Sequence, residues 1–192
     1  MHVMNRGVRR TPIFHCIDDY RYFMFLMDEA QKGHDCQILA YCLMPNHFHI
    51  LLGVGKEPPG GFMKHLQMKY AIYYNQVNDC SGHLFEHRYL SVIAKNEAYL
   101  TEVSRYIHLN PVKAGIVSKP IQYDYSSYSE YMNTMAYFRK PNVYSGRILS
   151  LFDSQDSKRA AEAYKYFVES RLFEHKYESE VQHDISEAPI LR

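Results

Sequence analysis

Two histidines separated by one residue open an apolar run, His47-Phe48-His49-Ile50-Leu51-Leu52. Side chains alternate across a β-strand, so residues two apart share a face. If this run is a strand, His47 and His49 point the same way, while Phe48 and Ile50 point into the core. Two neighbouring imidazoles are natural ligands for a divalent metal. Two unrelated histidines in one strand would give the same pattern, so the pair alone does not define a metal site.

A second candidate pair is Tyr106 and Asn110. Residues four apart on a helix lie on one face, so a helix here would place the phenol beside the amide. Tyrosine can form covalent intermediates, but its ordinary pKa of about 10 means that it must be activated. A metal that polarises a phosphoryl group would ease the attack, and the amide oxygen of Asn110 could be its third ligand. Three other tyrosines in a predicted helix remain alternative nucleophiles: Tyr70, Tyr73 and Tyr74.

The hydrophobic pattern predicts the elements that must hold these residues. Strands and helices are recognised by apolar residues at spacings of two and of three to four, and turns by Gly, Pro and Asn. The predicted order is strand, helix, hairpin, helix, strand, helix, which fits an α+β, ferredoxin-like split βαβ plan with an antiparallel sheet and flanking helices. The predicted elements are a strand at His2 to Met4, a helix at Asp18 to Lys32, strands at Gln37 to Met44 and His47 to Val54 around Pro45-Asn46, a helix at Phe62 to Val77, a strand at Arg88 to Ala94, and a helix from Glu97, capped by Asn96, to about Leu109 or Asn110, where Pro111 should end or kink it.

The composition of the chain changes after this core. The change comes beyond Pro120, where tyrosines lie among serines, and we predict a first domain over residues 1–130 and a partly helical C-terminal extension over residues 131–192. Ala160 to Phe173 has a helical pattern, and the acidic residues past Tyr177 predict a loose tail. The extension carries no recognisable chemistry of its own.

Charge and composition limit the possible functions. The 192 residues carry a net charge of +1, so any nucleic-acid surface must come from local clusters of positive charge. No run of about 18 apolar residues occurs, which predicts no membrane span, and Met1 to Arg6 lacks the apolar core of a signal peptide. The four cysteines include no C-x-x-C pair. We therefore expect a cytoplasmic protein with buried or inert thiols.

Taken together, the two candidate pairs resemble a known family. Met44-Pro45-Asn46-His47-Phe48-His49-Ile50-Leu51 and the later segment Tyr106-Ile107-His108-Leu109-Asn110-Pro111-Val112-Lys113-Ala114-Gly115 resemble the single-tyrosine HUH transposases. The closer match is to the transposases associated with repetitive extragenic palindromes (REP), which are IS200-like. His2 to Gly7 is similar to the first strand of that family, and Ser81 to Tyr89 to the loop before its later strand. The resemblance covers roughly residues 1–130.

This resemblance implies a role for each matching residue. His47 and His49 match the metal-binding histidines, Tyr106 matches the nucleophile, and Asn110 matches the polar residue that completes the metal site. Enzymes of this kind attack a phosphate of single-stranded DNA and leave a 5′-phosphotyrosine and a free 3′-hydroxyl. The implied cofactor is Mg²⁺ or Mn²⁺, whereas two imidazoles judged by ligand softness alone favour Zn²⁺ or Mn²⁺. The implied assembly is a homodimer that recognises hairpin-bearing single-stranded DNA.

Basic residues near these segments are candidates for phosphate contacts, which would make binding dependent on salt. The densest cluster follows the first predicted strand, and two further basic residues flank the tyrosine. The candidates are Arg6, Arg9, Arg10, Lys69, Arg88, Arg105 and Lys113. Tyrosine and phenylalanine rings could add base stacking.

Three other functions remain open at this point. The histidine pair also suits other HUH nucleases, such as replication initiators and relaxases. A transposase-derived protein that binds DNA without cutting it is a second alternative, and a metal-binding protein with an unrelated role is a third. Loss of cleavage in Tyr106→Phe with binding retained would favour the transposase.

Overall fold

Four strands form one antiparallel sheet in the order β2-β3-β1-β4 in the computed structural model, which describes residues 1–134 and 140–173. The strands are β1 (His2–Arg6), β2 (Cys36–Met44), β3 (His47–Val54) and β4 (Leu90–Val92). Helix α1 (Ile17–Gly33) connects β1 to β2, and α2 (Gly60–Val77) connects β3 to β4. This is the predicted ferredoxin-like arrangement, with β4 shorter than the predicted strand.

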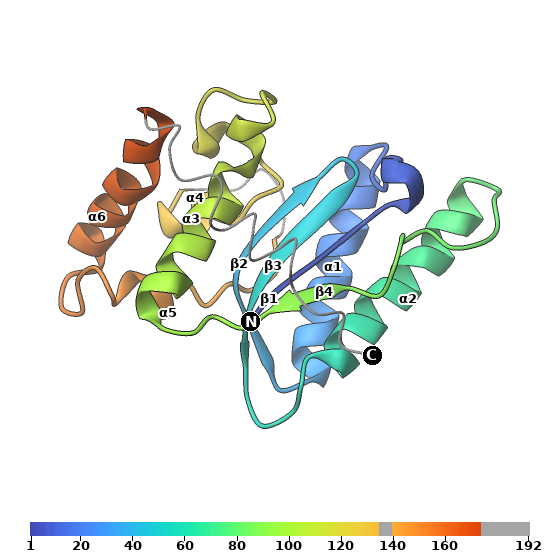
Figure 1. The fold of residues 1–192 in the computed structure, drawn as a ribbon, viewed down its shortest axis with the longest axis horizontal. Helices are drawn as coiled ribbons and strands as arrows, with labels where there is room; N and C mark the ends of the chain where they lie inside the picture. The colour runs from blue at the N-terminus through green and yellow to red at the C-terminus, as the bar shows by residue number, and fades with distance from the viewer. Residues whose placement is uncertain (135–139, 174–192) are drawn as a thin grey trace.

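The two faces of the sheet are covered by different helices (Figure 1). Phe48, Ile50 and Leu52 of β3 are buried in the core that includes α1 and α2. Leu51 points the other way and packs in a second core with Val103 and Ile107 of α3 (Glu97–Lys113). The predicted alternation of side chains from His47 to Leu52 is confirmed, because alternate residues of β3 pack in the two different cores.

The helix ends follow from local side chains. At the start of α1, the carboxylate of Asp19 accepts hydrogen bonds from the backbone N–H groups of His15 (2.6 Å) and Cys16 (3.1 Å). Asn96 caps α3 as predicted, since its side-chain oxygen accepts from the N–H of Tyr99 at 2.8 Å. The Asn96 contact satisfies a backbone donor that the first turn of a helix leaves unpaired, and the Asp19 contacts fix the two residues that precede α1.

The prediction that α3 ends near Leu109 or Asn110 is wrong, because the helix continues through Pro111 to Lys113. Pro111 has no N–H to donate to the carbonyl of Ile107, so the helix passes through it with one intrahelical hydrogen bond fewer, and its ring is buried. The N–H of Ala114 still bonds to the carbonyl of Asn110 at 2.9 Å. The chain then leaves the helix at Gly115, whose φ of 69° suits a glycine.

The segment that follows α3 covers the outer edge of β2. It contains η2 (Pro120–Gln122), α4 (Tyr128–Tyr131) and α5 (Gly146–Leu149). The N–H of Leu43 bonds to the carbonyl of Tyr125 (2.9 Å), and the N–H of Ser127 bonds to the carbonyl of Tyr41 (3.0 Å). An open strand edge is a template for pairing with other chains, and this segment satisfies that edge within the molecule.

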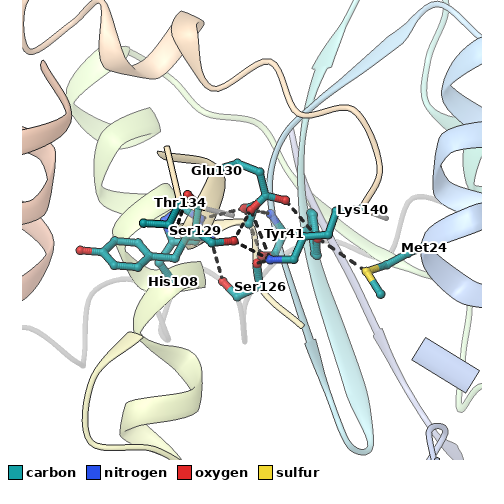
Figure 2. A network of polar contacts seen from close by, with 10 residues as sticks. Met24, Tyr41, His108, Ser126, Ser129, Glu130, Thr134 and Lys140 are labelled. Carbon is teal, nitrogen blue, oxygen red and sulfur yellow. Dashed lines mark hydrogen bonds and ion pairs between the residues drawn. The ribbon is translucent and has the colours of Figure 1, made fainter. Parts of the chain in front are cut away.

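Lys140, between α4 and α5, anchors the middle of this segment (Figure 2). Its ammonium, in a side chain only 6% exposed, donates to the carbonyl of Ser126 at 2.8 Å and to the hydroxyl of Ser129 at 2.6 Å, and pairs with the carboxylate of Glu130 at 3.4 Å. The hydroxyl of Tyr41 also approaches Glu130, at 3.5 Å. A buried cation is tolerated when its donors are satisfied in this way.

The last described helix, α6 (Ser157–Glu169), packs against α3 and continues as η3 (Ser170–Phe173). It begins three residues before the predicted helix because the carboxylate of Asp156 caps it, accepting from the N–H groups of Lys158 and Arg159. The predicted acidic tail lies outside the described residues. The described part of the chain contains no helix that could span a membrane, and all four cysteines are free.

Candidate active site

The His-x-His pair stands at the start of β3, directly after the Pro45-Asn46 turn that joins it to β2. Strand alternation turns His47 and His49 to the face that α3 covers, with ring centroids 5.1 Å apart. His49 is buried, with 4% of its surface exposed, while His47 is partly open. One imidazole is therefore fixed in the core, and the other lies at the rim of the site.

Helix α3 brings Tyr106 and Asn110 to the same place. The ring of Tyr106 lies edge-on to His49, with centroids 5.4 Å apart. Asn110, one turn further along, donates from Nδ2 to the backbone carbonyl of Tyr106 at 3.1 Å. Its side chain also forms hydrogen bonds that affect the titration of His47 and Tyr106. The two pairs identified in the sequence therefore form one cluster.

Burial controls the protonation of this cluster. It lowers the pKa of His47 from 6.5 to about 4; a hydrogen bond with Asn110 opposes the shift and the charge of Arg6 adds to it. Burial, with the neighbouring His2 and His47, also holds the pKa of His49 well below 6.5. Both imidazoles are thus neutral near pH 7 and keep the lone pair that a metal needs. Burial raises the pKa of Tyr106 above 10, with a hydrogen bond from Asn110 acting against it.

The donor set fits a divalent metal. Within residues 1–134 and 140–173, no three His, Cys, Asp or Glu side chains are grouped to hold a metal, so a third protein ligand would have to be of another type. The amide oxygen of Asn110 is the candidate for that role, since the amide nitrogen donates to the Tyr106 carbonyl and the side chain also contacts His47. Two imidazoles and one amide oxygen match the ligands that Mn²⁺ and related metals accept.

Several of the basic residues singled out in the sequence gather at the His47 end of the sheet. Arg6 lies opposite His47 in the β1–β3 register, on the same face, and pairs with Glu86. Asn46 Nδ2 donates to the carbonyl of Arg10 at 3.1 Å, so the Val8–Arg10 turn (η1) lies against the hairpin turn. The residues at this end are Arg6, Arg9, Arg10 and Arg88, all of them exposed.

The other three basic candidates differ in their positions. The ammonium of Lys113 is 5.3 Å from the centroid of the Tyr106 ring, which brings a positive charge to the site. Lys69 is exposed on α2, on the opposite side of the sheet (Figure 1). Arg105 is buried, pairs with Glu102 and stacks over Phe167 at 4.2 Å. Lys69 and Arg105 are therefore separated from the histidine cluster.

The alternative nucleophiles lie on α2 and take part in other contacts. Tyr70 is fully buried in the core beneath α1 and α2 and donates to the carbonyl of Ile13 at 2.5 Å. Tyr73 donates to Asp19 at 3.1 Å, and Tyr74 is within 2.9 Å of a ring nitrogen of His15. Of the four tyrosines considered, Tyr106 is the one that faces the histidine pair.

Two residues of this site were missed in the sequence analysis. His2 Nε2 lies 3.0 Å from Nδ1 of His49, and Asn46 Oδ1 lies 2.7 Å from Nδ1 of His47. Asn46 is adjacent to His47 and could have been considered for that reason. Nothing local in the sequence connects His2 with His49, because their contact depends on the register between β1 and β3.

Comparisons with known proteins show what the chain is similar to. The family described as "Transposase IS200 like" matches residues 1–110. A solved structure of a REP-associated tyrosine transposase bound to a REP hairpin is similar with a TM-score of 0.56 and 16% identity, covering 75% of this chain and 84% of that one. A structure of a putative transposase from Deinococcus radiodurans R1 has a TM-score of 0.41 and 17% identity, covering 55% and 85%. No curated protein matches the chain.

Proposed function

Because the chain belongs to the IS200-like transposase family, we propose that it is a metal-dependent single-stranded DNA endonuclease and strand transferase. The observation that carries this proposal is the approach of Tyr106 and Asn110 on α3 to His47 and His49 on β3. A phenol beside a metal-ligand set is the constellation that phosphotyrosine chemistry requires. The proposed nucleophile is Tyr106.

The proposed reaction is the one that the resemblance to the family implies for this phenol. The oxygen of Tyr106 attacks a phosphorus of single-stranded DNA, and the bond from phosphorus to the 3′-oxygen breaks. The phenol gives up its proton and the departing oxygen takes one up, which leaves a 5′-phosphotyrosine and a free 3′-hydroxyl. Attack by another 3′-hydroxyl reverses the step and joins strands. Each bond broken is replaced by a bond of the same type, so no external energy source is needed.

His47, His49 and Asn110 would hold the metal, which we propose to be Mg²⁺ or Mn²⁺. When bound, the metal supplies Lewis-acid polarisation of the phosphoryl oxygens. The protein contributes orientation, because a buried strand and a helix position the ligands and the phenol. Burial raises the pKa of Tyr106, so the phenol is protonated at rest and loses its proton only as it attacks.

The DNA substrate is proposed to lie over the His47 end of the sheet. Arg6, Arg9, Arg10 and Arg88 there, with Lys113 beside the phenol, would bind phosphates. A hairpin-bearing strand is the proposed partner, supported by the REP hairpin in the structure of the similar transposase. A homodimer and a cytoplasmic location complete the proposal and rest on the family.

A covalent-adduct assay tests this function directly. Labelled single-stranded DNA with a hairpin is incubated with the protein and Mn²⁺ and then run on a denaturing gel. We expect a slow-migrating protein–DNA band that requires metal and is absent in Tyr106→Phe. Tyr74→Phe is the matched control, since it removes a partly buried tyrosine hydroxyl on the other side of the sheet, and it should form the adduct normally.

The other outcomes separate the alternatives. An adduct that persists in Tyr106→Phe would place the nucleophile at another tyrosine and refute the proposed mechanism. DNA that is bound but never cleaved by the wild type, on any hairpin substrate, would identify a binding protein derived from a transposase. An adduct on DNA that lacks any hairpin would point to a replication initiator or relaxase type of nuclease.

A further inference from the structure

His2 is a buried polar residue in β1 that faces the candidate active site. It is 1% exposed and lies opposite Leu51 in the β1–β3 register. Leu51 is the next residue after His49 on that face of β3. Its Nε2 is 3.0 Å from Nδ1 of His49, and the ring centroids are 5.1 Å apart. The edge of its ring also meets Tyr106, with centroids 6.2 Å apart. His2 therefore touches both a proposed metal ligand and the proposed nucleophile.

A metal-binding imidazole needs a partner for its second nitrogen. When one ring nitrogen binds a metal, the other carries the proton, and the group that accepts this proton sets the tautomer and the ring orientation. His47 has such a partner in Asn46, whose Oδ1 lies 2.7 Å from Nδ1. The Nδ2 of Asn46 is committed to the carbonyl of Arg10, so its oxygen faces His47. An amide oxygen only accepts, which leaves Nε2 of His47 with the lone pair.

His2 occupies the equivalent position beside His49. For Nε2 of His49 to bind a metal, Nδ1 must carry the proton and donate it to Nε2 of His2. His2 then carries its own proton on Nδ1, a buried atom that has no hydrogen-bond partner among the described residues. Leaving a buried donor unpaired is unfavourable. The unpaired Nδ1 of His2 is explained if the hydrogen bond that its Nε2 accepts from His49 offsets this cost.

We propose that His2 is a positioning residue of the metal site, which accepts the Nδ1 proton of His49 and thereby turns Nε2 of His49 toward the metal. This inference rests on the metal-dependent function proposed above. Asn46 and His2 would then leave Nε2 as the metal-binding nitrogen of both histidines, with one partner taken from the adjacent residue and the other from a neighbouring strand.

Two substitutions of His2 separate positioning from packing. His2→Phe keeps an aromatic ring against His49 and Tyr106 in a buried place but removes the acceptor. His2→Gln loses the ring and keeps an oxygen that can accept from His49. If His2 only fills space, Phe is the milder change; if His2 positions His49, Gln is the milder change. Met4→Leu is the matched control for packing, because Met4 lies directly opposite His49 on the same face of β1 and leucine keeps a buried apolar side chain of similar size there.

Mn²⁺ binding, measured without DNA by the electron paramagnetic resonance signal of the free ion, gives the first readout. We expect His2→Phe to weaken binding by about 10- to 100-fold, and His2→Gln and Met4→Leu to remain within a factor of about 3 of the wild type. Circular dichroism identifies any variant that does not fold. Wild-type affinity in a folded His2→Phe variant would overturn the proposal.

The tautomer of His49 gives a second readout, which needs no His2 variant. Nitrogen-15 NMR of the wild-type protein loaded with diamagnetic Mg²⁺ should show the His49 proton on Nδ1, hydrogen-bonded to an imidazole. A proton on Nε2 of His49 would refute the positioning role.

These readouts also distinguish the two proposals. Mn²⁺ binding that depends on His2, without any covalent adduct, would overturn the proposed cleavage and support the role of His2. Cleavage that is equally fast in the wild type and in His2→Phe at limiting Mn²⁺ would support the proposed cleavage and overturn the role of His2.

Discussion

Two basic residues that flank the proposed nucleophile lie in different environments on the same helix. Arg105 is turned into the interior, where its guanidinium pairs with Glu102, donates to the carbonyl of Phe167 at 3.3 Å and stacks on that ring. Lys113 is exposed beside the Tyr106 ring. A basic residue close to Tyr106 in the sequence is therefore not always able to contact DNA. The face of α3 on which it lies determines whether it is exposed.

Removing these two charges should have opposite consequences. Arg105→Met should lower the free energy of unfolding by about 2 kcal/mol, since it removes charge-assisted hydrogen bonds in a buried place, while hairpin DNA binding of the folded fraction stays unchanged. Lys113→Met should leave stability unchanged and reduce the salt dependence of DNA binding by about one phosphate contact. Urea unfolding and fluorescence-anisotropy titrations at several salt concentrations measure both. Unchanged stability in Arg105→Met would show that its buried contacts contribute little.

At the level of elements, the connection from β1 to the Val8–Arg10 turn depends on a glycine. Gly7 has an ordinary φ of −64°, so it is needed for space and not for backbone freedom. A Cβ at this position would lie 2.3 Å from the carbonyl oxygen of Thr11 and 2.8 Å from a methyl of Ile13. The N–H of Gly7 bonds to the carbonyl of Asn46 at 2.9 Å. Gly7 thus lets the arginine-bearing turn lie close to the hairpin that presents His47.

Gly7→Ala should be destabilising by about 1–3 kcal/mol, the usual range for a group forced into a packed place. It should also weaken metal binding, because the turn and the His47 hairpin must move apart. Gly33→Ala is the control: Gly33 ends α1, and a Cβ added there would meet nothing within 4 Å, while helical alanine is favoured over glycine by about 0.5–1 kcal/mol. Equal stabilities of the two variants by thermal unfolding would show that the turn adjusts freely.

At the scale of the whole molecule, the segment after α3 completes the fold on the second face of the sheet. Tyr128, Tyr131, Tyr164 and Val168 are buried in the same core as Leu51 of β3. The predicted boundary after residue 130 stays a prediction about organisation, but residues from both sides of it share this core. His108 lies within it, with its ring nitrogens 2.7 Å from the Tyr164 hydroxyl and 2.8 Å from that of Ser127.

Buried neutral histidines should make the whole molecule sensitive to acid. Burial lowers the pKa of His108 and of His2 from 6.5 to about 3, and that of His47 to about 4. Below pH 6.5 these histidines take up protons in the unfolded chain but stay neutral in the folded protein. The free energy of unfolding therefore falls as the pH falls, until the pH reaches the pKa values of the folded state. Each such histidine contributes about 1.4 kcal/mol per pH unit in that window. A total stability of about 5–15 kcal/mol would be lost within a few pH units.

Urea unfolding between pH 7 and pH 4, in EDTA so that no metal contributes, measures this dependence. His108→Gln can keep hydrogen bonds to Tyr164 and Ser127 without titrating, and it should reduce the slope by about 1.4 kcal/mol per pH unit. The variant should be less stable than the wild type at pH 7 and closer to it at pH 5. Parallel curves for the two proteins would mean that His108 takes up a proton in the folded state.

Much of the fold of this protein could be predicted from patterns of residues that are close together in the sequence. The alternation around His47 and His49, the spacing of Tyr106 and Asn110, the cap at Asn96 and the order of strands and helices are visible in residues close in the sequence. They predicted the ferredoxin-like fold and the two pairs, while the meeting of the two pairs in one site was implied by the family resemblance. The tertiary structure alone decided three features. His2 reaches His49 through the register of two strands, Arg105 is buried by a helix that arrives some 60 residues later, and the edge of β2 is hydrogen-bonded by Tyr123, Tyr125, Ser127 and Tyr144. Each depends on which distant segments pack together, and hydrophobic periodicity shows that a face is buried but not what buries it.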